Sequence, residues 1–155
     1  MLADFHFVAE PNSTAIIITR AFAAPRALVF DAWTKSEHVS KWWDPTGAPL
    51  AVCDIDFRIG GSFRWVNSGP DGSGHPFTGT YTKIEAPRRL SFKAQTLGGP
   101  ESIGTLVFSE TESGTLLTMT IDCASIEERN WFLEMRVDAG TEQTLANLAA
   151  FLEKP

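Results

Sequence analysis

Between residues 50 and 122, short segments of alternating apolar and polar residues are separated by turn-forming residues, and this pattern restricts the possible folds most. The segments are rich in β-branched and aromatic residues, which predicts strands. Gly, Pro, Ser and Asp fill the intervals between them. The predicted strands are 51–57, 62–67, 77–85, 89–96, 103–110 and 115–122. Consecutive short strands joined by tight turns form an antiparallel meander.

The segment before the meander predicts one further strand and two short helices. Thr14–Phe22 is rich in β-branched residues and ends in a turn, which is typical of a strand. Pro25 suits the first turn of a helix, because its missing N–H would have no intrahelical partner there. We therefore predict a helix over 25–33, and a second one that is capped by Ser36 and ends near Trp42 and Trp43.

The C-terminal segment predicts a long helix. Ser125–Glu128 has the form of a capping box, which marks a helix start. An apolar stripe follows at steps of three and four residues: Val137, Thr141, Leu145, Leu148 and Leu152. Gly140 lies inside this stretch and disfavours a helix by about 1 kcal/mol relative to Ala. It predicts either a break near Met135–Asp138 or a close approach to the sheet.

These elements predict an α+β fold of the helix-grip kind. A curved antiparallel sheet of about seven strands has one face to cover, and only the terminal helix is long enough to lie across it. The two short helices between the first and second strands would close one end of the groove. The whole chain, 1–155, is predicted to be a single domain with an N-terminal arm over 1–12.

Composition and charge exclude several classes of partner. Thirteen Lys and Arg face nineteen Asp and Glu, so a net charge of −6 argues against nucleic acid and anionic membranes. No segment approaches the ~20 apolar residues of a membrane span, and the opening segment has no secretory signal pattern, so we expect a cytoplasmic protein. Cys53 and Cys123 are expected to be free thiols, and no motif for a cofactor or metal is found.

The sequence resembles the START-like (SRPBCC) superfamily, and within it the branch of homologues of the activator of the heat-shock-protein-90 ATPase. Four stretches carry the resemblance: Ala24–Trp33 with Trp42-Trp43, Asp56–Phe63, Phe77–Leu90 and Gly140–Leu152. The resemblance covers nearly the whole chain. It implies a helix-grip fold with a cavity, in a family that includes binding proteins, cyclases or hydratases, and co-chaperone domains.

One position departs from the pattern of that branch. The branch usually has Gly-Trp at the start of its last helix, whereas Gly140 is followed here by Thr141. The resemblance therefore implies that this chain lacks one aromatic wall of the usual pocket.

Aromatic residues are the main candidates for a ligand site, because flat rings bind apolar or aromatic ligands well. Neighbours on a helix point about 100° apart, so at least one of Trp42 and Trp43 is predicted to be partly exposed or to face the pocket. The full set of predicted ligand-binding residues is Trp33, Trp42, Trp43, Trp65, Tyr81, Met119 and Leu145. Ordinary core packing is the competing interpretation of the tryptophans.

Two residues are weak candidates for proton transfer. His75 lies at the end of a Gly-rich turn, where exposure to solvent is the competing interpretation, and Tyr81 lies in mid-strand. Glu134 and Asp138 could supply a carboxylate, although a surface position is favoured for both.

Two arginines, Arg58 and Arg64, lie in or next to the first strands of the meander. Arg58 precedes the turn formed by Gly60 and Gly61 and is expected to pair with Asp56 or a nearby carboxylate. Arg64 and Trp65 are adjacent in a strand, so only one of them can point inward.

Three functions follow from these features. The first is binding of a small, mostly apolar or aromatic molecule between the sheet and the C-terminal helix. The second is a cofactor-independent enzyme of the cyclase or hydratase kind, which requires two polar groups that converge on one ligand position. The third is a co-chaperone-like protein-interaction module, ranked below the other two. The sequence leaves the choice between monomer and homodimer open.

Overall fold

The computed structural model describes residues 5–68, 76–96 and 99–153. Within these residues, eight strands form one antiparallel sheet in the order β1-β2-β8-β7-β6-β5-β4-β3. The strands are β1 (Phe5–Val8), β2 (Ala15–Phe22), β3 (Val52–Ile55), β4 (Ser62–Val66), β5 (Pro76–Glu85), β6 (Arg89–Thr96), β7 (Glu101–Thr111) and β8 (Gly114–Cys123). The first two strands therefore extend the predicted meander on its β8 side.

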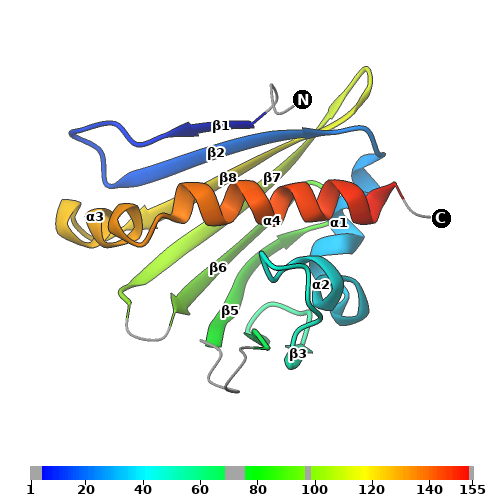
Figure 1. The fold of residues 1–155 in the computed structure, drawn as a ribbon, viewed down its shortest axis with the longest axis horizontal. Helices are drawn as coiled ribbons and strands as arrows, with labels where there is room; N and C mark the ends of the chain where they lie inside the picture. Colours follow the sequence, from blue (N-terminus) through cyan, green and yellow to red (C-terminus); the bar gives the residue numbers. More distant parts are fainter. Residues whose placement is uncertain (1–4, 69–75, 97–98, 154–155) are drawn as a thin grey trace.

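Four helices accompany this sheet in the described part of the chain. They are α1 (Arg26–Thr34), α2 (Ser36–Trp42), α3 (Ile126–Glu134) and α4 (Val137–Leu152). Figure 1 shows α4 lying across one face of the sheet, with α1 and α2 at one end of it and α3 at the other. The predicted α+β helix-grip architecture is thus confirmed.

The sheet has one strand more than predicted. Phe5–Val8, which the sequence analysis assigned to an N-terminal arm, pairs with β2 from Phe5 opposite Arg20 to Val8 opposite Ile17. Four residues are too short to give a clear alternating pattern, so pairing with a neighbouring strand decides their conformation. The other seven predicted strands agree with the structure to within two residues at each end.

Local sequence features explain how several elements begin and turn. Gly60 adopts a φ of +85°, which glycine tolerates without steric cost, and this permits the tight turn between β3 and β4. Arg58 Nε pairs with Asp56 at 3.0 Å beside that turn, as expected. Ser36 was predicted to cap α2, but this prediction is wrong, because Lys35 occupies the N-cap and Ser36 is the first helical residue.

The C-terminal helical segment is divided at Met135 and Arg136. The Ser125 hydroxyl accepts a hydrogen bond of 3.1 Å from the Glu128 N–H, which confirms the predicted cap of α3. Arg136 has φ 58° and ψ 48°, in the left-handed region, so α3 and α4 cannot form one continuous helix. The predicted break is confirmed, whereas the alternative for Gly140 is not, because a Cβ there would meet nothing within 4 Å.

The core lies between the sheet and the helices. Alternate residues of the strands, such as Ile16 and Ile18 on β2, are fully buried, as the period-two pattern requires. Leu145 and Leu148 of α4 are likewise fully buried. This arrangement leaves α4 as the cover of the sheet and places its first turn beside α3.

Candidate ligand-binding site

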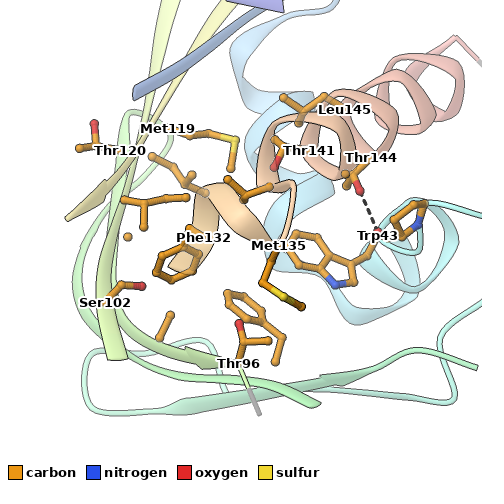
Figure 2. Close-up of a pocket in the computed structure, with 18 of the residues that line it drawn as sticks. Trp43, Thr96, Ser102, Met119, Thr120, Phe132, Met135, Thr141, Thr144 and Leu145 are labelled. Carbon is orange, nitrogen blue, oxygen red and sulfur yellow. Dashed lines mark hydrogen bonds between the residues drawn. The ribbon is translucent and has the colours of Figure 1, made fainter. Parts of the chain in front are cut away.

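A cavity of about 410 Å³ lies between the inner face of the sheet and the helices α3 and α4. Figure 2 shows Trp43 and Phe132 on opposite sides of this space, with Thr141 and Leu145 of α4 along another side. The described residues that line it are Trp33, Trp43, Pro45, Asn67, Phe77, Phe92, Ala94, Thr96, Ser102, Gly104, Leu106, Met119, Thr120, Ile121, Trp131, Phe132, Met135, Arg136, Val137, Gly140, Thr141, Thr144 and Leu145.

One wall of the cavity is built from stacked aromatic rings. Trp43 stacks on Phe77 of β5 with ring centroids 5.3 Å apart and an interplanar angle of 22°. Trp65 lies behind this pair, with its ring centroid 4.7 Å from that of Trp43. Such contacts each contribute about 0.5–1.5 kcal/mol beyond area burial, so they hold this wall of the cavity in place.

The opposite wall comes from α3 and the start of β7. The Trp131 ring lies against Gly99, where an added Cβ would approach its Cη2 atom to 2.4 Å. The rings of Trp131 and Phe132 meet edge to face at 5.1 Å. Glycine at position 99 thus allows α3 to approach the end of the sheet closely enough to wall the cavity.

Two glycines border the cavity for different reasons. An added Cβ at Gly104 would lie 2.5 Å from the Phe92 ring, so the absence of a side chain on β7 makes room for that ring. Gly140 faces open space instead, since nothing lies within 4 Å of its Cβ position. Thr141, where the sequence pattern of the family has Trp, also lines the cavity. Small side chains at 140 and 141 therefore leave part of this space unfilled.

The cavity lining is mainly apolar, and Arg136 is the one charged residue among the described residues that line it. Arg136 Nε lies 3.0 Å from an oxygen of Asp138, and Nη2 lies 3.1 Å from the other. This hydrogen-bonded pair lowers the pKa of the Asp138 carboxyl and raises that of Arg136. Hydroxyl and amide groups supply the remaining polarity of the lining. Among the described residues, no cluster of three or more His, Cys, Asp and Glu could hold a metal ion.

A family model described as activator of Hsp90 ATPase homolog 1-like protein matches residues 23–153. The chain belongs to this family. The match confirms the resemblance drawn from the sequence motifs, and the described cavity-lining residues, from Trp33 to Leu145, all lie within the matched region. The family assignment thus covers α1 through α4, whereas β1 and β2 precede the match.

Solved structures of similar proteins support the same assignment to the Hsp90 ATPase activator homolog 1-like family. A crystal structure of a Rhodobacter sphaeroides protein has 28% identity and a TM-score of 0.86, with 96% of this chain and 98% of that chain covered. A Mycobacterium smegmatis protein has 26% identity and a TM-score of 0.85, with 95% of each chain covered. A search of curated proteins gave no match.

The structure places four of the predicted ligand-binding residues on the cavity: Trp33, Trp43, Met119 and Leu145. The other three pack in the core instead: Trp42, Trp65 and Tyr81, with exposed fractions of 0%, 3% and 2%. Trp42 donates its indole N–H to the Ala32 carbonyl at 3.0 Å, which holds its ring between α1 and α2. Its neighbour Trp43 is half-buried and lines the cavity, so the prediction that at least one of the two adjacent tryptophans is partly exposed or faces the pocket is confirmed.

The candidates for proton transfer lie apart from the cavity or outside the described structure. His75 lies outside the described residues. Tyr81 is not among the described residues that line the cavity, and burial raises the pKa of its phenol, with a smaller contribution from Cys53. Glu134 is exposed, and Asp138 is paired with Arg136, in agreement with the favoured surface positions. Arg64 is exposed and Trp65 buried, so the tryptophan is the inward member of that pair.

Several lining residues were missed by the sequence analysis, notably Phe77, Phe92, Trp131, Phe132 and Arg136. The alternating pattern of the strands could have identified Phe77 and Phe92. Phe77 lies four residues before Tyr81 on β5 and Phe92 lies two residues before Ala94 on β6, so each points to the same face of the sheet as that buried neighbour. The two on α3 follow a recognised capping motif at positions that face the sheet. No local pattern identified the arginine, whose role depends on where α3 ends.

Proposed function

We propose that this protein binds a small, mostly apolar or aromatic molecule in the cavity between the sheet and α4. The observation that carries the proposal is an aromatic lining around about 410 Å³ of unfilled space. Protein interiors are ordinarily packed to about 0.74 of their volume, so a space of this size is more than a packing defect. It falls within the range of about 300–1,000 Å³ that small-molecule sites occupy.

The chemistry of the lining supports an apolar ligand. Six aromatic side chains border the cavity: Trp33, Trp43, Phe77, Phe92, Trp131 and Phe132. At interior packing density the cavity accommodates a ligand of up to about 300 Å³, which leaves room for a molecule with two or three aromatic rings. The half-buried Trp43 and the exposed Met135 border the same space, so the cavity has a route to solvent.

A neutral fluorescent probe tests the proposal directly. N-phenyl-1-naphthylamine contains three aromatic rings and emits strongly only in apolar surroundings. Titration of the protein with this probe should give saturable emission with one site per chain and should quench part of the tryptophan fluorescence. The absence of saturable binding would overturn the proposal.

A cavity-filling variant locates the binding. Thr141→Trp places an indole in the cavity and should lower probe affinity at least tenfold, because the ring occupies ligand volume. Ala150→Trp is the matched control, since Ala150 is exposed on the same helix and the variant adds the same chromophore. Equal probe affinity in both variants would place the binding elsewhere and contradict the proposal. Native mass spectrometry of the freshly purified protein would identify a retained ligand.

A further inference from the structure

Three of the polar lining residues, Asn67, Thr96 and Ser102, lie at one end of the cavity. The register places Phe77 of β5 opposite Thr96 of β6, and Ala94 opposite Ser102 of β7. Asn67 follows directly on β4, whose last residues pair with the start of β5. Asn67, Thr96 and Ser102 therefore border the cavity at the same end of their strands.

The junction of α3 and α4 lies at this same end of the strands. The contact of Trp131 with Gly99 places α3 beside the residues that immediately precede β7. Met135 and Arg136 follow α3, line the cavity and are largely exposed, at 63% for the methionine and 69% for the arginine side chain. This end of the strands is therefore the mouth of the cavity, and the guanidinium of Arg136 lies there, paired with Asp138.

The other end of the cavity is buried and uncharged. Trp33 of α1, Leu106 of β7 and Leu145 of α4 line it with exposed fractions of 3%, 2% and 0%. A charged group would be strongly disfavoured there, since burial of an unpaired charge costs several kcal/mol. The cavity thus has an uncharged, buried end and a mouth that carries the guanidinium of Arg136.

The guanidinium of Arg136 is oriented and still has free donors. Asp138 binds Nε and Nη2, which uses two of the five N–H groups. The other three remain available to an anion, and the bidentate pair with Asp138 favours one orientation of the guanidinium. The left-handed backbone of Arg136 costs about 1–2 kcal/mol for a residue with a side chain, so a specific conformation is maintained at the mouth.

We propose that the ligand is an amphipathic acid, whose apolar body occupies the cavity and whose single acidic group lies at the mouth against Arg136. This inference rests on the proposed function and specifies its ligand class. An apolar molecule with a terminal carboxylate, sulfonate or phosphate group matches both the buried end and the cationic end. A neutral molecule of the same shape would bind more weakly, because it gains no hydrogen bond from the three N–H groups of Arg136 that Asp138 leaves free.

Two matched probes separate the charge from the apolar body. The anion 1-anilinonaphthalene-8-sulfonate and the neutral N-phenyl-1-naphthylamine share the same ring system and differ by one sulfonate group. Titration of the native protein should give tighter binding of the anion at low salt. Added sodium chloride should reduce this preference, since the cation is exposed to screening.

A pair of arginine variants assigns the effect to one residue. Arg136→Gln should lower affinity for the sulfonate about fivefold, a modest change because the side chain is exposed, and should alter affinity for the neutral probe less than twofold. Arg58→Gln is the matched control, since Arg58 is equally exposed at 69% and also pairs with an aspartate two residues away. The control should leave both affinities unchanged. Circular dichroism and thermal unfolding establish that each variant is folded.

The outcomes distinguish this inference from the proposed function. Equal losses for both probes in Arg136→Gln, or no loss for either, would overturn the inference while probe binding by the native protein still supports the proposed function. Equal affinities of the native protein for the two probes would also overturn it. A native protein that binds neither probe would overturn both.

Discussion

The side-chain amide of Asn147 on α4 donates a hydrogen bond of 3.0 Å to the carbonyl oxygen of Asp44. One turn earlier, the Thr144 hydroxyl donates to the Trp43 carbonyl at 3.2 Å, the contact drawn as a dashed line in Figure 2. These two bonds attach the segment after α2 to α4. Because that segment carries Trp43 and Pro45, α4 determines the position of one cavity wall.

Removal of this attachment should lower the stability of the fold. Asn147→Leu keeps the side-chain size but leaves backbone carbonyls without their donor, which should lower the free energy of unfolding by about 1–2 kcal/mol. Urea unfolding measures the change. Gln143→Leu is the control, because Gln143 is exposed and bonds only to Asn147 among the described side chains. A loss as large in the control as in Asn147→Leu would contradict the proposed role.

Gly140→Ala should stabilise the protein. Its Cβ would meet nothing within 4 Å, and Ala is favoured over Gly in a helix. The expected gain is about 0.5–1 kcal/mol, measured as a higher urea midpoint with an unchanged slope. A lower midpoint would show that the first turn of α4 requires glycine.

Gly104→Ala should have the opposite effect. Its Cβ would lie 2.5 Å from Phe92, inside contact distance, so the ring must move. Overpacking of this kind costs about 1–3 kcal/mol, and the displaced ring should also reduce the volume available to N-phenyl-1-naphthylamine. Thermal unfolding and probe titration measure the two effects. An unchanged melting temperature would mean that Phe92 yields without cost.

The Asp138 carboxyl should titrate below its ordinary pKa. Hydrogen bonds from Arg136 favour the charged form, so the stabilisation is present above the unfolded-state pKa and is lost as pH falls through the lower folded-state pKa. Side-chain NMR chemical shifts follow this titration residue by residue. Arg136→Gln should move the pKa upward, and an unshifted titration in that variant would contradict the pairing.

The Cys53 thiol should react slowly with alkylating reagents. Burial raises its pKa from 9.0 to about 11, with a smaller contribution from Asp54. At pH 9 the thiolate fraction of the folded protein is then about fiftyfold below that of the unfolded chain, and the thiolate is the reactive form. Iodoacetamide labelling of a Cys123→Ser variant, with and without urea, measures the ratio. Equal rates in the two conditions would contradict the shift.

The sequence was sufficient to predict the fold because its local signals agree with one another. Alternation in residues 50–122 predicted the meander, and the Ser125 cap and the apolar stripe predicted the terminal helices. The β1 strand was not predicted, because Phe5–Val8 is too short to show a clear alternating pattern and its conformation depends on pairing with β2. Elements that are determined by their own sequence pattern were therefore predictable, whereas an element that depends on pairing with another strand was not.

The cavity was predictable in location but only partly in composition. The tryptophans indicated an aromatic site. Trp42 and Trp65 are nevertheless covered by other side chains, whereas Trp43 borders the cavity, and the sequence does not distinguish these environments. Whether an inward ring borders space depends on the side chains of the facing helix, here Gly140 and Thr141. The position of Arg136 depends on the end of α3, which the sequence placed only to within a few residues.

The first turn of α4 has a consequence for how such a protein can diversify. Gly140 and Thr141 line the cavity. Leu145 and Leu148, one and two turns later, are fully buried and pack the helix against the sheet. Substitutions at the beginning of a single helix can therefore change the shape and size of the cavity. The buried contacts of Leu145 and Leu148 with the sheet would remain intact.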